Sequence, residues 1–170
     1  ITLCNSGVMA FNAKYIWEIL EKIDNKNSKQ EFYLTDAVEI AHNLNYNAGY
    51  IVDDIKNLMG ANTKLELELL ENHFQNLQRE KFLNQGVQLI DKSSIYFSLD
   101  TTIGKDVIIY PNVFIGAKVT IGDNTTIFPM CVIEDATIGS NVNIGPFARL
   151  RPQSILQVNV HIGNFVEIKK

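Results

Sequence analysis

Two cationic residues, Arg151 and Lys169, lie eighteen residues apart in a region that repeats every six residues. Each directly follows an aliphatic residue of the repeat, so three repeats bring the chain back to the same position. Paired strands lie about 4.8 Å apart, and two like charges at that spacing repel each other unless an anion lies between them. Arginine can grip a phosphate with two parallel hydrogen bonds, and lysine adds a point charge. The spacing therefore indicates either an anion site or two solvated surface cations.

Few residues could act as a nucleophile, a base or a soft metal ligand. His42 and His73 fall on predicted helix faces, where we expect them to be solvated, and His161 should point outward from the repeat. Cys4 and Cys131 have apolar neighbours and belong to no CxxC or His/Cys cluster. We expect both thiols to be buried and reduced, which favours a cytoplasmic location. None of these five residues is a predicted catalytic group.

The composition excludes two classes of partner. Of the 170 residues, 46% are hydrophobic and 20% charged, and the net charge is -4. Nucleic-acid phosphates attract basic faces, so we expect no nucleic-acid partner. No apolar run approaches the roughly 18 residues that a membrane span needs.

The chain begins with Ile rather than Met, in a stretch typical of a strand, so we expect an internal segment of a longer protein.

The strongest pattern is a period of six in the C-terminal half. After one single-residue deletion near residue 137 the same register continues. The aliphatic positions are Ile103, Ile109, Ile115, Ile121, Ile127, Ile133, Ile138, Ile144, Leu150, Leu156, Ile162 and Ile168. A small or β-branched residue follows most of them four positions later. Six are followed directly by glycine, where we expect turns with positive φ: Gly104, Gly116, Gly122, Gly139, Gly145 and Gly163.

A period of six is typical of a parallel β-helix. Each short strand forms one side of a triangular prism, three sides make a coil, and each coil bonds to the next. The aliphatic residues should point inward, Ile115 and Ile144 among them.

The N-terminal part has a different pattern. Residues 1–64 read as mixed α/β, with strands at 1–4 and 50–52 and helices starting near Asn12 and at Thr35. Residues 65–86 predict an amphipathic connecting helix that ends at a glycine. Its narrow apolar stripe consists of Leu67, Leu70, Phe74 and Leu77.

Several short stretches, taken with this organisation, resemble one family. They are NSG (residues 5–7), EFYLTD (31–36), GAN (60–62), GPFARLRP (145–152) and GNFVEIKK (163–170). The sequence resembles the bacterial bifunctional N-acetylglucosamine-1-phosphate uridyltransferase / glucosamine-1-phosphate N-acetyltransferase family. The last two stretches are the most specific. The resemblance covers essentially the whole chain, which would form the middle of the family's sequence.

The resemblance implies a fold and an activity. Residues 1–64 would be the C-terminal part of a Rossmann-like α/β nucleotidyltransferase domain, and residues 65–86 a linker helix. Residues 87–170 would begin a left-handed parallel β-helix of hexapeptide repeats, the acetyltransferase domain. The family transfers acetyl from acetyl-CoA to glucosamine-1-phosphate. It then transfers uridyl from UTP to the N-acetylated product, which releases pyrophosphate and forms UDP-N-acetylglucosamine.

Two asparagines acquire roles only through the resemblance. Asn62 matches a protein ligand of Mg²⁺, and an amide oxygen suits that ion. Asn5 matches a residue that hydrogen-bonds the sugar, where an amide can donate and accept. Without the resemblance, both are typical turn formers.

Five further residues match substrate positions of the family. Glu31, Tyr33 and Thr35 match its sugar-side loop, and Arg151 and Lys169 match residues that hold glucosamine-1-phosphate. The family's general base and most acetyl-CoA contacts fall outside these 170 residues. We therefore expect no catalytic residue in this segment, and no turnover of either step by the segment alone.

The family forms homotrimers, so the resemblance also implies a trimer. Two other classes of function stay open. One is another sugar-1-phosphate nucleotidyltransferase whose β-helix serves assembly; the cations at Arg151 and Lys169 argue against a purely structural helix. The other is a non-catalytic β-helix scaffold, which would favour a regular flat face of threonines, whereas the outward positions here are irregular.

Overall fold

The computed structural model describes residues 4–54 and 57–169. The chain divides into two compact units, Ile1–Met59 and Gly60–Lys170.

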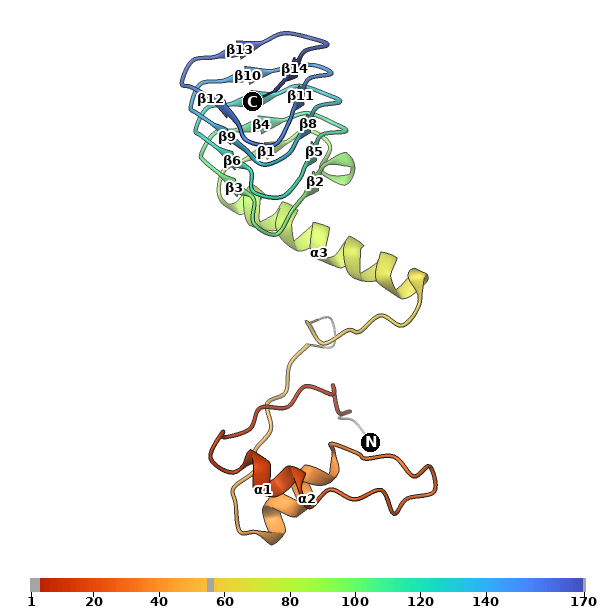
Figure 1. Cartoon of the computed structure of the whole chain (residues 1–170). Coiled ribbons are helices and arrows are strands. Elements are labelled where there is room, and N and C mark those ends of the chain that lie inside the picture. Colours follow the sequence, from red (N-terminus) through yellow and green to blue (C-terminus); the bar gives the residue numbers. More distant parts are fainter. Residues whose placement is uncertain (1–3, 55–56, 170) are drawn as a thin grey trace. The chain divides into compact units, whose positions relative to one another are not determined.

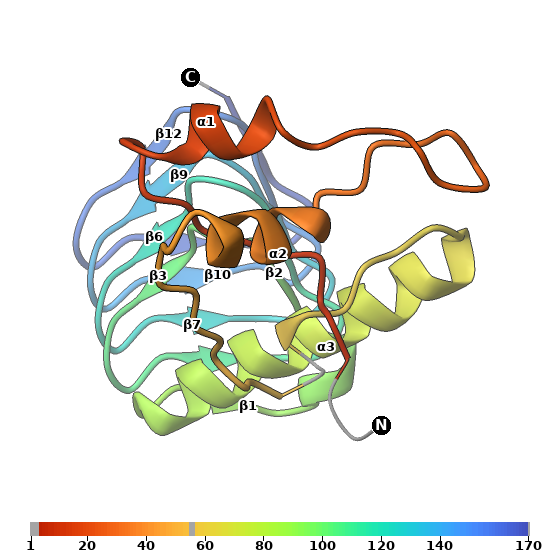
Figure 2. The same cartoon turned by 90° about the horizontal axis from the view of Figure 1, so that it is seen from below.

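The second unit contains a parallel β-helix of two- and three-residue strands (Figure 1). Its first sheet has the order β1 (Gln88–Leu89), β4 (Ile108–Ile109), β7 (Thr126–Ile127), β10 (Asn143–Ile144) and β13 (His161–Ile162). The second sheet contains β2 (Tyr96–Phe97), β5 (Phe114–Ile115), β8 (Val132–Ile133), β11 (Arg149–Leu150) and β14 (Glu167–Ile168). The third contains β3 (Thr102–Ile103), β6 (Thr120–Ile121), β9 (Ala136–Ile138) and β12 (Ser154–Leu156), which form one column in Figure 2.

The aliphatic repeat positions form the interior, as the period predicts. Ile115 is 1% exposed and Ile144 is fully buried. The small residues four positions later fill the space beside them, Val107 and Cys131 among them. Ile103, Ile162 and Ile168 are only partly buried because they lie in the first or last turns. The hydrophobic effect thus acts on two positions of each six-residue repeat, coil after coil.

The single-residue deletion is taken up at one corner. Ile115 pairs with Ile133 eighteen residues later, whereas Ile121 pairs with Ile138 only seventeen later. Asp135 occupies that corner with φ +42°, two residues after Ile133, where other corners allow three. The stack of coils stays in register because the missing residue shortens a turn and leaves the strands unchanged.

The prediction that glycines supply positive φ at the turns is wrong, apart from Gly145. The corner residue three positions before most aliphatic positions adopts positive φ. These residues are Asp106, Asn112, Lys118, Asn124, Met130, Asp135, Asn141, Phe147, Gln153, Asn159 and Phe165. Several glycines are needed for space instead. A Cβ on Gly122 would lie 2.6 Å from the backbone of Gly139 in the next coil, and one on Gly139 would lie 2.8 Å from the nitrogen of Val158.

The β-helix begins before the repeat is visible in the sequence. Leu89 pairs with Ile109 and Phe97 with Ile115. Between the first two strands the chain makes a 3-10 turn, η2 (Lys92–Ser94), whose N-cap Asp91 accepts a hydrogen bond from the Ser93 amide. This insertion breaks the six-residue spacing, so periodicity alone does not reveal the first coil.

Helix α3 (Lys64–Asn84) connects the start of this unit to the β-helix. Thr63 and Glu66 form a capping box at its N-terminus, and Gly86 follows the C-cap with φ +92°. The predicted apolar stripe is buried only in part, because Leu70 and Phe74 are half-buried whereas Leu67 is 59% and Leu77 49% exposed. The buried face is instead Gln75, Gln78, Arg79 and Phe82. Among the described residues, no helix combines the length and the hydropathy that crossing a membrane requires.

The polar side chains of that face form hydrogen bonds with the unpaired backbone groups at the open edge of the first coil. The Gln75 amide accepts from the Phe97 N–H at 2.9 Å and donates to the Phe97 carbonyl at 2.8 Å, as a neighbouring strand would. The Arg79 guanidinium donates to the Ile95 carbonyl at 3.0 and 3.1 Å and to the Ser93 carbonyl at 3.2 Å. Phe82 packs against Phe97 with ring centroids 4.8 Å apart. The C-terminal half of α3 therefore caps the β-helix (Figure 1).

The first unit contains two short helices, α1 (Ile16–Leu20) and α2 (Asp36–Asn43). Ile19, Ala37 and Ala41 form their small core. The helix expected near Asn12 begins only at Ile16, after a turn in which Asn12 accepts a hydrogen bond from the Lys14 N–H, whereas the helix expected at Thr35 begins directly after it, at Asp36. The strand predicted at 50–52 is wrong, because Ile51 is 95% exposed and residues 4–54 contain no strand with which it could pair. The strand predicted at 1–4 falls mostly outside the described residues.

The two cysteines differ, and the prediction that both are buried is wrong for Cys4, which is exposed in a segment without regular structure. Cys131 is fully buried inside the β-helix, and desolvation raises the pKa of its thiol. The raised pKa leaves little of the Cys131 thiol in its reactive thiolate form, and burial shields the sulfur from reagents.

We expect a thiol-specific disulfide reagent to titrate one thiol per native chain rapidly and the second only in denaturant. Rapid reaction of both thiols in the folded chain would contradict the placement of Cys131.

Candidate functional site

Arg151 and Lys169 leave the β-helix at equivalent points of adjacent coils. Leu150 and Ile168 are Cα partners in β11 and β14, and the Arg151 amide donates to the Ile168 carbonyl at 3.1 Å. The side chains of Arg151 and Lys169 are 47% and 64% exposed. The register that the repeat predicts for this pair is therefore present, on an open surface.

An anion does lie between the two cations, and it is a carboxylate of the chain itself. Glu167 contacts Arg151 at 3.8 Å (Oε1 to Nη1) and Lys169 at 3.5 Å (Oε2 to Nζ). Sequence reasoning missed Glu167, although its position two residues before Lys169 places it on the same face of the strand. The repulsion between the cations is thus partly compensated inside the protein.

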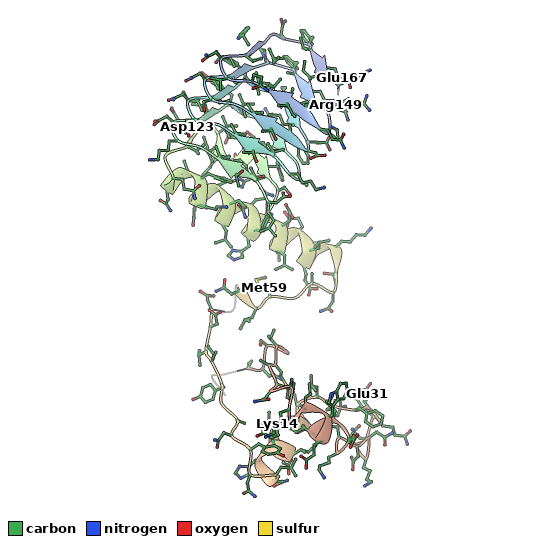
Figure 3. The ribbon with its side chains drawn as sticks, turned by 60° about the vertical axis from the view of Figure 1, so that its left-hand side comes forward. Lys14, Glu31, Met59, Asp123, Arg149 and Glu167 are labelled. Atoms are coloured by element: carbon green, nitrogen blue, oxygen red, sulfur yellow. The ribbon has the colours of Figure 1, made fainter. Side chains whose placement is uncertain are left out.

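A second ion pair adjoins the first. Arg149 contacts Glu134 at 3.7 Å (Nη2 to Oε2), and both side chains are partly exposed. Arg149 is also the direct Cα partner of Glu167, beside which it lies in Figure 3. Three cations and two carboxylates leave this cluster (Glu134, Arg149, Arg151, Glu167 and Lys169) one net positive charge. Such a surface can attract a phosphate-bearing ligand, with Arg151 offering a planar pair of donors.

Asn62, the predicted Mg²⁺ ligand, lies just before α3 and is exposed. Its backbone N–H donates to Glu66 at 2.7 Å, and this bond and that from the Thr63 N–H lower the pKa of the Glu66 carboxyl. The Glu66 carboxylate is thus engaged in the capping box of α3. Within the described residues no three His, Cys, Asp or Glu side chains gather to hold a metal. The role of Asn62 as a magnesium ligand therefore stays a prediction.

The other predicted residues near the N-terminus lie in the first unit. Asn5 is exposed and its Oδ1 accepts from the Gly7 N–H at 3.0 Å, the arrangement of a turn former. Glu31 is exposed, Tyr33 is half-buried, and Thr35 precedes α2 without a capping side-chain bond. The structure brings Glu31, Tyr33 and Thr35 together only as one continuous loop.

None of the three histidines is a member of the charged cluster. His42 and His161 are exposed as predicted. His73 is half-buried on α3, and its Nε2 is shielded from solvent without a hydrogen-bond partner, so the prediction that it is solvated is wrong. A helix surface becomes partly buried once α3 lies along the β-helix, and the helical pattern alone did not indicate that contact.

Comparisons with known proteins agree with the hexapeptide-repeat fold of the second unit. The family described as "Bacterial transferase hexapeptide (six repeats)" matches residues 100–135. The bifunctional protein GlmU of Paramagnetospirillum magneticum is 44% identical over 168 residues, which are 99% of this chain and 37% of that protein. The GlmU proteins of Zymomonas mobilis and Agrobacterium fabrum are 42% and 41% identical over 170 residues, which are 100% of this chain and 38% of each protein. The chain thus spans well under half the length of these relatives, and it belongs to the family of the bifunctional protein GlmU.

Proposed function

We propose that this chain is the part of a bifunctional sugar-nucleotide transferase that contributes the phosphate-binding surface of its acetyltransferase site. Arg151 and Lys169 would hold the phosphate of glucosamine-1-phosphate while acetyl-CoA acetylates the amine. The observation that supports this most directly is the stacking of the two cations on adjacent coils, with Glu167 in the place between them.

The whole-chain similarity to GlmU proteins supports a second activity of the longer protein, uridyl transfer from UTP to N-acetylglucosamine-1-phosphate. Residues 1–64 would close the Rossmann-like domain that performs this step, with Asn5 and the loop of Glu31, Tyr33 and Thr35 on the sugar side. Mg²⁺ would require carboxylate ligands beyond those described, with Asn62 as one amide ligand. The left-handed sense of the β-helix and the homotrimer are further parts of the proposal.

The scaffold alternative has one observation in its favour. Thr102, Thr120 and Thr137 occupy paired outward positions of β3, β6 and β9, and the hydroxyl of Thr102 donates to that of Thr120 at 3.0 Å. The ladder ends at Ile155, the next residue in register, so it does not form an extended flat face. A non-catalytic scaffold would not explain the charged cluster on the second sheet.

The test of the proposal is the substitution Arg151→Ala in a chimera. Residues 1–170 replace the matching segment of the Paramagnetospirillum magneticum protein. Losing a charge-assisted hydrogen bond costs roughly 1.5–3 kcal/mol, so we expect kcat/KM for acetyl transfer to glucosamine-1-phosphate to fall about 10- to 100-fold. Uridyl transfer should be unchanged.

The matched control is Lys105→Ala, which removes an exposed cation from another part of the same β-helix. Both activities should survive that change. Equal loss of both activities in Arg151→Ala, or loss of neither, would show that the stacked cations are not the phosphate site.

A further inference from the structure

The charged cluster lies on three adjacent strands of the second sheet, in two columns of residues. The β8, β11 and β14 strands place Val132, Arg149 and Glu167 in one column of Cα partners. The residues two positions later continue the register, because the Glu134 amide donates to the Leu150 carbonyl at 3.2 Å and the Arg151 amide to the Ile168 carbonyl at 3.1 Å. The second column is therefore Glu134, Arg151 and Lys169.

Each ion pair between strands joins a residue of one column to a residue of the other, so the pairs run diagonally across the strands. Arg149 reaches Glu134, and Arg151 reaches Glu167, although Arg149 and Glu167 are the direct neighbours. Each of these three pairs joins two adjacent strands, whose backbones lie about 4.8 Å apart. Arg149 can therefore pair with either carboxylate by a change of rotamer.

We propose that Arg149 is a positioning residue that receives Glu167 when an anion occupies the Arg151–Lys169 pair. A bound phosphate takes over the two cations and repels the carboxylate between them. Glu167 then has one cation left beside it, the guanidinium of Arg149, which gives up Glu134. This inference rests on the proposed function, because it assumes that the pair binds phosphate.

The charges explain why Arg149 should leave Glu134 for Glu167 once phosphate is bound. Without Arg149, the displaced carboxylate would face a phosphate with no nearby cation, and anion binding would weaken. Glu134, by contrast, is 39% exposed and can be solvated when it loses its partner. The side chains involved are 39–64% exposed, so they can rearrange without disturbing the buried Leu150 and Ile133 beneath them.

The test is a double-mutant cycle on the 170-residue chain, with inorganic phosphate as the probe at constant ionic strength. NMR titration gives the Kd, and the carboxyl resonance of Glu167 reports its partner. We expect Arg149→Gln to weaken phosphate binding about two- to fivefold, the range that corresponds to exposed ion pairs. Arg149→Lys should restore most of the affinity. In a Glu167→Gln background, where no carboxylate is displaced, Arg149→Gln should leave the Kd unchanged.

Two outcomes would overturn the inference, and they differ. If Arg149→Gln weakens binding equally with and without Glu167, Arg149 acts only as a general positive charge, while the phosphate site itself stands. If Arg151→Ala leaves the phosphate Kd unchanged, the phosphate site and the exchange both fall. A Glu167 carboxyl resonance that shifts on phosphate binding in the wild type and not in Arg149→Gln supports the exchange.

Discussion

Gly122→Ala is expected to destabilise the β-helix by about 3 kcal/mol, at the upper end of the range for overpacking. The added Cβ would lie 2.6 Å from the carbonyl carbon of Gly139 and from the nitrogen of Ser140. Both atoms are backbone of the next coil, whose hydrogen bonds fix its position, so they cannot move aside as a flexible side chain would. Urea unfolding of the 170-residue chain measures the effect.

The matched control is Gly163→Ala in the same chain. A Cβ at Gly163 would meet no atom within 4 Å, and its φ is not in the left-handed region. That substitution should be neutral or stabilise slightly, since alanine reduces the entropy of the unfolded chain. If both variants unfold at the same urea concentration, close coil contact is not the reason for these glycines.

Gln75→Leu is expected to cost about 2–4 kcal/mol, because it leaves two buried backbone groups of Phe97 without partners. Phe97 is 2% exposed, so water cannot replace the lost bonds. Leucine is similar in size to glutamine, which keeps the packing of α3 nearly constant. Urea unfolding gives the free energy, and hydrogen exchange of the Phe97 amide should accelerate.

Gln88→Leu provides the same substitution at an exposed position of β1. It should change the stability by less than about 0.5 kcal/mol, as surface substitutions usually do. A Gln75→Leu chain that is as stable as wild type, with a slowly exchanging Phe97 amide, would show that α3 does not cap the first coil through this side chain.

The interior of the β-helix could be predicted from the sequence because its order is one-dimensional. Each aliphatic residue is buried by its neighbours one coil above and below, so a constant spacing is enough to identify Ile109 or Ile144 as core. The same spacing placed Arg151 and Lys169 in register. Where the spacing is broken, as between Leu89 and Phe97, periodicity does not predict the first coil.

The N-terminal unit and α3 were predicted less well. A strand such as the one expected at 50–52 requires a partner, and hydropathy does not say whether one is present. The packing face of α3 is built from Gln75, Gln78 and Arg79, which a hydrophobic pattern assigns to solvent. These polar residues are buried because the open backbone edge of the first coil supplies their hydrogen-bond partners.

The repeating fold, the inward residues and the position of two cations on adjacent coils can therefore be predicted from the sequence, because all three depend only on spacing along the chain. Which charges pair, by contrast, depends on the tertiary structure. Glu167 lies between Arg151 and Lys169, and Arg149 turns to Glu134, because side-chain direction depends on every charge within reach across three strands. The tertiary structure also decided that glycines serve close backbone contact at Gly122 and Gly139, since the distance between coils is a property of the stack.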